Sequence, residues 1–218
     1  MIFRTEVARS PAGEGASGMA VQGIDVSKYQ GKIDFGAVKA ADKSFVFVKA
    51  TEGDTGVDPS FASNIAASRA AGLMTGAYHF YISHDAAESQ FANFSKHVSL
   101  GAGDLPPVVD IENLASHSPD GWQNTLRQFL QLLEKHYGVQ PIIYSGVSFA
   151  NSYLSGFQDY PLWVAQYTSA PQPKVPADWK VWSFWQYSQS GNVAGIAGAV
   201  DLNCFNGAEA QLRKFLIG

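Results

Sequence analysis

Leu105–Glu112 reads LPPVVDIE: two prolines, a short apolar run, and two carboxylates, Asp110 and Glu112, separated by one residue. This composition is typical of a short buried strand that ends at a polar edge. Side chains alternate along a strand, so both carboxylates point to the same face, roughly 7 Å apart at Cα. Such a pair suits the cleavage of a glycosidic bond, since that chemistry needs one protonated and one ionised acid. Two acids at this spacing are common, so the rest of the chain has to show whether this pair is catalytic.

The composition is that of a folded protein with one substantial core. The chain has 218 residues, of which 46% are hydrophobic and 16% charged. A net charge of −4 argues against a nucleic-acid partner. No apolar run approaches the ~18 residues of a membrane span. The single cysteine, Cys204, excludes an internal disulfide, and we expect it to be a small buried hydrophobic residue. Residues 1–20 are expected to form a flexible leader without the features of a signal peptide, and residues 21–218 one domain.

Apolar and β-branched stretches recur on both sides of the opening run. Most are short and almost continuously apolar, as in parallel sheets covered on both faces. They predict eight strands: Val21–Ser27, Phe45–Thr51, Thr75–Tyr81, Pro107–Glu112, Pro141–Ser145, Leu162–Tyr167, Val181–Tyr187 and Val200–Cys204.

Helical patterns separate the first six of these strands and follow the last one. They predict helices at Phe35–Ala41, Pro59–Ala71, Ala86–Val98, Asp120–Tyr137, Ser148–Leu154 and Ala208–Ile217. The links Ala170–Lys180, which contains three prolines, and Gln189–Gly198, which is glycine-rich, should hold no full helix.

This order of elements predicts an α/β fold: a single TIM-like (β/α)5(β)3 barrel with helices 6 and 7 missing. An open, doubly wound sheet is the structural alternative. The segment after the first strand, GIDVSKYQGKIDF, lacks the G-x-G-x-x-G turn that binds phosphates in many such sheets. We therefore favour the barrel.

In barrels of this kind the active site lies at the carboxyl ends of the strands. Acids and aromatic residues gather at those predicted ends, where crowding raises the pKa of the least solvated carboxyl group. Aromatic rings stack on sugars, and amides bind hydroxyl groups, so carbohydrate fits this edge better than a phosphate ligand. The predicted ends include Asp25 and Ser27, Glu52, Tyr78–Tyr81, Asp110 and Glu112, Tyr144, Trp163 and Tyr167, Trp185 and Gln186, and Asp201 and Asn203.

Eight short motifs carry a family resemblance: GIDVSKYQG, FVFVKATEG, GAYHFY, PPVVDIE, PIIYSG, LWVAQY, FWQYS and VDLN, in that order. From about Val21 to its C-terminus, the chain resembles glycoside hydrolase family 25, the Chalaropsis-type lysozymes. The resemblance implies a flattened barrel of five helices and eight strands. It also implies hydrolysis of the β-1,4 bond between N-acetylmuramic acid and N-acetylglucosamine in peptidoglycan.

The resemblance also implies roles for individual residues. Glu112 would protonate the glycosidic oxygen and later activate water. Asp110 would be its charge partner, either as a nucleophile or by orienting the substrate acetamido group, and we favour the second role with retention of configuration. Asp25 and Asp201 would orient water and tune Glu112, although Asp25 could also simply cap the loop before Lys28. The residues Tyr78, Phe80, Tyr144, Trp163, Tyr167 and Gln186 fit a substrate groove, and core packing is the alternative for each aromatic.

Other polar residues have structural interpretations. Glu52 could belong to the site or pair with Lys49. His79 should face the helices as a hydrogen-bonded core histidine. The histidines show no metal-ligand spacing, so we predict no metal and no cofactor.

Three other functions remain as alternatives. A chitinase-like enzyme of glycoside hydrolase family 18 would need D-x-D-x-E, and Val108 stands at the first of those acids. A sugar-binding barrel without activity should have lost one of the four acids. A metal-dependent deacetylase would need histidine ligands. We expect a monomer that acts on peptidoglycan glycan strands at the bacterial cell wall as a catalytic module alone, after release by phage lysis or a dedicated secretion machine.

Overall fold

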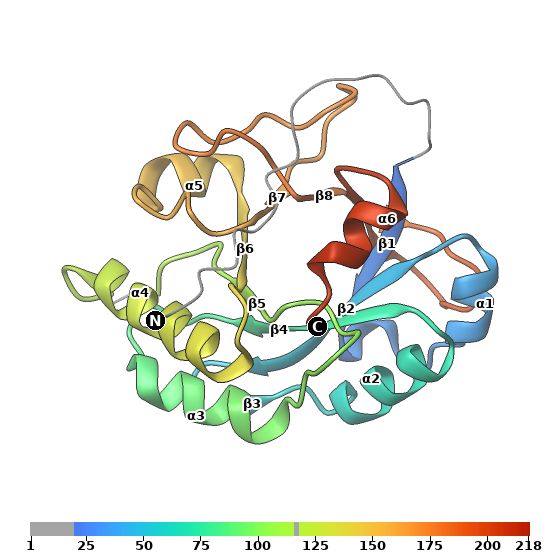
Figure 1. Ribbon diagram of the computed structural model, residues 1–218, viewed down its shortest axis with the longest axis horizontal. Helices are drawn as coiled ribbons and strands as arrows, with labels where there is room; N and C mark the ends of the chain where they lie inside the picture. The colour runs from blue at the N-terminus through green and yellow to red at the C-terminus, as the bar shows by residue number, and fades with distance from the viewer. Residues whose placement is uncertain (1–19, 116–117) are drawn as a thin grey trace.

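In the described part of the chain, nine strands form one sheet, eight of them close into a barrel, and helices cover its outer side (Figure 1). The structure is a computed structural model that describes residues 20–115 and 118–218. The predicted leader lies outside the described residues, apart from residue 20. The strands are β1 (Val21–Val26), β2 (Phe45–Glu52), β3 (Gly56–Val57), β4 (Met74–Phe80), β5 (Val108–Asp110), β6 (Ile142–Gly146), β7 (Leu162–Ala165), β8 (Phe184–Gly191) and β9 (Val200–Phe205).

The strand order is β1-β9-β8-β7-β6-β5-β4-β2-β3, and an additional β1–β2 pairing closes the barrel. Neighbouring strands from β1 through β2 and β4 to β8 are parallel. This arrangement confirms the TIM-like α/β barrel.

The helices alternate with the early strands, as predicted. They are η1 (Lys28–Gln30), α1 (Phe35–Ala40), α2 (Phe61–Ala70), α3 (Ala87–His97), α4 (Trp122–Tyr137), α5 (Val147–Tyr153), α6 (Glu209–Leu212) and η2 (Arg213–Phe215). The two proline- and glycine-rich links contain no helix. Gly138 ends α4 in the left-handed conformation (φ 73°), which glycine adopts without steric cost.

Several predicted details of the strands were wrong: the strand predicted to end at Tyr167 ends at Ala165, and the strand predicted at Val181–Tyr187 is shifted to Phe184–Gly191. The strand predicted at Pro107–Glu112 ends at Asp110, so Glu112 lies in the loop that follows. The two-residue strand β3, which pairs antiparallel to β2, was not predicted. The last strand, β9, runs antiparallel to both β1 and β8, so its first residues rather than its last reach the active-site edge. A short link between β8 and β9, without a crossover helix, makes this reversal necessary.

Strand alternation divides the apolar residues into two layers. Val46 and Val48 of β2 face the helices and belong to the larger core. Phe45 and Phe47 of the same strand face the barrel interior and pack there against Phe184. A methyl group on Gly23 would lie 2.4 Å from the Phe45 ring, so glycine at this strand position makes room for the aromatic side chain.

The C-terminal segment closes one end of the barrel. Leu212 of α6 and Phe215 of η2 join the interior cluster, and the Phe215 ring centroid lies 5.6 Å from that of Phe205. In the described part of the chain, no helix has the length and hydrophobicity needed to span a membrane.

Candidate active site

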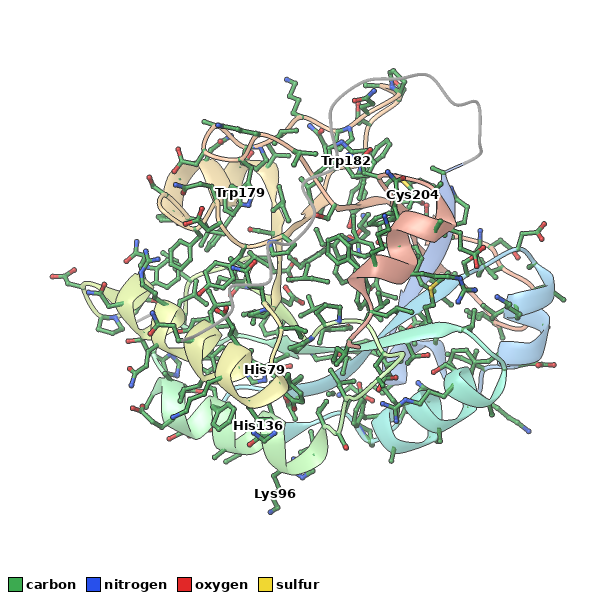
Figure 2. All side chains as sticks on the ribbon, viewed as in Figure 1. His79, Lys96, His136, Trp179, Trp182 and Cys204 are labelled. Carbon is green, nitrogen blue, oxygen red and sulfur yellow. The ribbon has the colours of Figure 1, made fainter. Side chains whose placement is uncertain are left out.

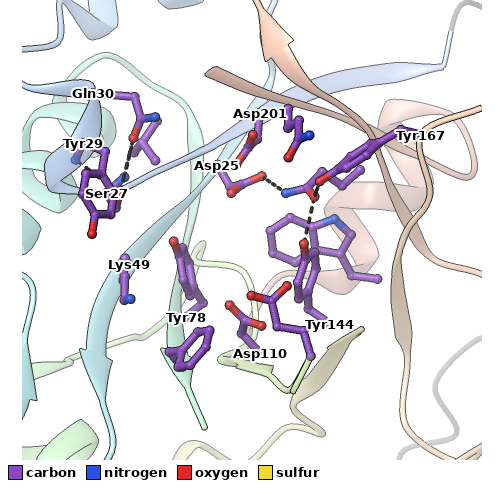
Figure 3. Close-up of a pocket in the computed structure, with 16 residues that line it drawn as sticks. Asp25, Ser27, Tyr29, Gln30, Lys49, Tyr78, Asp110, Tyr144, Tyr167 and Asp201 are labelled. Atoms are coloured by element: carbon purple, nitrogen blue, oxygen red, sulfur yellow. Dashed lines mark hydrogen bonds between the residues drawn. The ribbon is translucent and has the colours of Figure 1, made fainter. Parts of the chain in front are cut away.

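A cleft of about 290 Å³ opens at one end of the barrel (Figure 3). The structure brings together all ten residues that the sequence analysis assigned to catalysis or substrate binding. They are Asp25, Tyr78, Phe80, Asp110, Glu112, Tyr144, Trp163, Tyr167, Gln186 and Asp201. Most of them continue the inward-facing positions of their strands, directly above the apolar interior.

Asp110 and Glu112 lie on the same side of the cleft but differ in burial. Asp110 is 8% exposed, and its Oδ1 has no hydrogen-bond partner among the described residues, whereas Glu112 is exposed. Burial, followed by the charge of Glu112, raises the pKa of Asp110 well above its usual value. Burial also raises the pKa of Glu112, while the nearby Lys49 lowers both values. The pair therefore holds a proton more readily than free carboxyl groups do.

A second pair of acids, Asp25 and Asp201, lies across the cleft. The two residues are direct partners in the β1–β9 ladder. Burial and the charge of Asp201 raise the pKa of Asp25 well above its usual value, against the effect of two amide hydrogen bonds. Burial also raises the pKa of Asp201. Because two adjacent carboxylates repel each other, this pair also favours a state with one proton bound.

Amide side chains hold Asp25 in place (Figure 3). Its Oδ2 accepts hydrogen bonds from Gln186 Nε2 (2.9 Å) and from Asn203 Nδ2 (2.8 Å). The hydroxyl groups of Tyr144 and Tyr167 each donate to Gln186 Oε1 at 2.8 Å. Trp163 Nε1 donates to Asn203 Oδ1 at 2.9 Å. This network fixes the orientation of the Gln186 and Asn203 amides, so both N–H groups already point at Asp25.

The aromatic residues of the cleft fall into two groups. Trp163 and Tyr144 are 2% and 7% exposed, so they form the floor and support the polar network. Tyr167 is 50% exposed and can offer a ring face to a ligand. Burial and the surrounding acids raise the pKa of Tyr78 well above its usual value, so its hydroxyl stays protonated and can donate a hydrogen bond.

Several cleft residues were not predicted as members of the site. Lys49 was considered only as a partner for Glu52, yet it lines the cleft. Its inward position in β2, two residues after Phe47, could have indicated this. Tyr29, Gln30 and Gln189 come from segments outside the regular strands or at a strand end, where alternation gives no signal.

The structure supports the structural interpretations of Glu52, His79 and Cys204. Glu52 Oε2 lies 2.7 Å from Lys49 Nζ. His79 is fully buried, with Nδ1 2.7 Å from Thr51 Oγ1 and Nε2 3.0 Å from Gln90 Oε1. Burial lowers its pKa to about 4, so it is neutral near pH 7. Cys204 is a free, buried cysteine. Figure 2 shows His79 inside the molecule, in contrast to Lys96, which points outward.

No group of three or more histidine, cysteine, aspartate or glutamate side chains in residues 20–115 and 118–218 is arranged to hold a metal ion.

Comparisons with known proteins identify the family. The chain is 42% identical over 204 residues to protein YegX of Escherichia coli O157:H7, covering 91% of this chain and 74% of that protein. It is 36% identical over 212 residues to lysozyme M1 of Streptomyces globisporus, covering 88% and 70%. The crystal structure of the lysozyme from Streptomyces coelicolor superposes with a TM-score of 0.85 at 33% identity, covering 90% of this chain and 97% of that one. The family model "Glycosyl hydrolases family 25" matches residues 24–196. The chain therefore belongs to glycosyl hydrolase family 25, and it is a glycoside hydrolase.

Proposed function

We propose that this protein is a muramidase, which hydrolyses the β-1,4 bond between N-acetylmuramic acid and N-acetylglucosamine in peptidoglycan. The observation that carries this proposal is the arrangement of four carboxylates, in two pairs, around one open cleft on a family 25 barrel. Peptidoglycan glycan strands are then the substrate. The site of action is the cell wall, and residues 21–218 form the catalytic domain, which works as a monomer.

Glu112 is the general acid in this proposal. It lies at the exposed side of the cleft, where a glycosidic oxygen can reach it, and burial by neighbouring groups raises its pKa toward the protonated form. After the bond breaks, the same carboxylate accepts a proton from the attacking water. A general acid of this kind contributes about 10²- to 10⁴-fold to the rate.

Asp110 orients the acetamido group of the bound muramic acid. Its buried Oδ1 lacks a partner among the described residues, and an acetamido N–H would supply the missing hydrogen bond. Burial alone favours protonated Asp110, whereas this N–H and the positive charge that develops on the acetamido group favour its ionised form. The acetamido oxygen then attacks the anomeric carbon, the glycosidic oxygen leaves with the proton of Glu112, and water opens the ring intermediate with retention.

Asp25 and Asp201 position the attacking water and the neighbouring polar groups. Two amide donors fix Asp25 at its Oδ2, so its Oδ1 has a defined direction. Tyr78, Phe80 and Tyr167 provide ring surface or hydroxyl groups for the sugar, while Tyr144, Trp163 and Gln186 hold the floor of the cleft in place.

The test is digestion of purified peptidoglycan, reduction of the new ends with borohydride, and their identification by mass spectrometry. Reduced muramic acid ends are expected. Reduced glucosamine ends would instead identify a glucosaminidase, and the absence of digestion of any wall, acetylated or not, would identify a binding module. Asp110→Asn should strongly reduce the digestion, and Glu112→Gln should nearly abolish it.

A further inference from the structure

A second groove of about 560 Å³ joins the active-site cleft from the side. The segment 52–58, which includes β3, forms one wall of this side groove, and Ile82, His84 and Asp85 after β4 form another. Tyr29 and Lys49 line both the side groove and the cleft, so the two concavities meet at these side chains.

Buried hydrogen bonds hold the walls of the side groove in place. Asn93, which is 6% exposed, donates from Nδ2 to the carbonyl oxygens of Gly53 and Gly56, both at 2.9 Å. Gly53 has φ 55°, and a Cβ there would lie 2.7 Å from Asp85 Oδ2. Asp58, which is 7% exposed, ties this segment to η1 by accepting the Lys28 backbone N–H at 2.9 Å. The groove is therefore already formed before a ligand arrives.

The groove offers charges of both signs together with an exposed ring. Lys28 brings positive charge, Asp54 and Asp85 bring negative charge, and Lys49 and Glu52 form an ion pair at 2.7 Å on the same lining. Tyr29 is 81% exposed, and Val57 is 43% exposed. A ligand with carboxylates, amines and small apolar side chains would match these groups better than a neutral sugar. A short peptide has this chemistry.

The place where the groove meets the cleft is close to the reacting groups. Lys49 lines the cleft together with Asp110 and Glu112, and its positive charge accordingly lowers the pKa of both carboxyl groups. Because Tyr29 and Lys49 line both concavities, a branch on a sugar bound at that pair has a path past these two side chains into the side groove. In peptidoglycan the muramic acid carries such a branch, a peptide stem attached through its lactyl group. A polymer of N-acetylglucosamine carries none.

We propose that the side groove binds the peptide stem of the muramic acid whose bond is cleaved, an inference that rests on the proposed muramidase function. The stem enters between Tyr29 and Lys49 and lies along segment 52–58. Binding there holds the muramic acid in register with Glu112, so the enzyme distinguishes stem-bearing glycan from bare glycan.

The test compares two substrates made from one peptidoglycan preparation: glycan strands with their stems, and the same strands after an amidase has removed them. The wild-type enzyme should cleave the stem-bearing strands with a kcat/KM roughly tenfold higher, which corresponds to one well-formed set of contacts. Thr55→Trp, which fills the groove from its exposed turn, should remove most of this advantage and change cleavage of bare strands less than about twofold.

Two further variants secure the interpretation. Asp54→Lys changes the charge of the groove without filling it, and it should reduce the same advantage if Thr55→Trp does not fold. Ala66→Trp places the same indole on the exposed face of α2 and should change neither rate. An equal rate of the wild type on both substrates would overturn the proposal, as would groove variants that alter both rates equally or alter neither. Failure to cleave either substrate would instead remove the proposed muramidase function itself.

Discussion

The two ends of the barrel interior are built by the same strands but have opposite chemistry. At the closed end, Phe47 packs against Trp163 and Phe184 at ring distances near 5 Å, and the one polar atom of these three side chains, Trp163 Nε1, is hydrogen-bonded to Asn203. Two residues further along the same strands, at the open end, stand Lys49 and Gln186. The closed end supplies stability, whereas the open end buries carboxylates whose pKa values are raised first by burial and then by a neighbouring acid, as for Asp25 beside Asp201 and Asp110 beside Glu112. Function and stability are thus separated by two residues along a strand.

Glu112→Gln, at the open end, should have the largest effect of the four variants, and that effect is on activity. Removal of the general acid should lower kcat by as much as about 10⁴-fold and leave the free energy of unfolding within about 0.5 kcal/mol, because Glu112 is exposed. Turbidity of peptidoglycan suspensions and urea denaturation measure the two quantities. Glu209→Gln, at a surface pair with Arg213 remote from the cleft, is the control and should retain activity. Substantial activity in Glu112→Gln would assign the acid to another residue.

Phe47→Ala, at the closed end, should lower the stability of the protein. Phe47 is fully buried and stacks on Trp163 with a centroid distance of 4.6 Å, so its loss should cost about 3–5 kcal/mol of unfolding free energy. The midpoint of urea denaturation measures this loss. The control is Val181→Ala, at a side chain that is 43% exposed, which should change stability by less than about 0.5 kcal/mol. A similar small change in both variants would show that the aromatic cluster does not carry the stability of the barrel.

Asp110→Asn should lower activity and raise stability, so it separates the two properties. A carboxyl group whose folded-state pKa is raised stabilises the fold only at low pH, and that stability is lost as the pH rises through the folded-state value. The neutral amide avoids this loss, so it should raise the unfolding free energy at pH 7 by roughly 1 kcal/mol while activity falls. Thermal unfolding from pH 4 to pH 8 is the measurement. Equal stability of wild type and variant across this range would show that ionisation of the buried Asp110 carboxyl group does not lower the unfolding free energy.

Lys49→Met should have the smallest effect of the four variants, a shift in the pH dependence of activity. Lys49 lowers the pKa values of Asp110 and Glu112, so its removal should shift both limbs of the pH profile of kcat/KM to higher pH. The rate on the acidic limb should fall by roughly two- to fivefold, the range expected for a partly exposed charge. Lys49→Arg keeps the charge and should restore the wild-type profile. A shift in the opposite direction, or none, would show that Lys49 acts only through packing.

Much of the fold and the site was predictable because alternation and order along the chain carry the information. Asp25, Asp110 and Tyr144 occupy inward positions at the ends of apolar strands, and they meet as soon as those strands pair in sequence order. The reversal of β9 was not predictable from its residues, since VDLN alternates in the same way in either direction. Asp201 was nevertheless placed correctly, because its rim position follows from the antiparallel pairing with Asp25.

By itself the sequence determined the barrel class and the acids and aromatic residues at the strand ends, because hydrophobic period and residue type are local properties, and the family resemblance then selected four of those acids. Only the tertiary structure decided that Asp110 is buried, with an oxygen that has no partner in residues 20–115 and 118–218, while Glu112 is exposed, since burial depends on the neighbouring strands. It also decided that Lys49 enters the acid cleft and that Tyr29 and Lys49 join it to a side groove. These features arise from contacts between segments far apart in the chain, and no local pattern encodes such contacts.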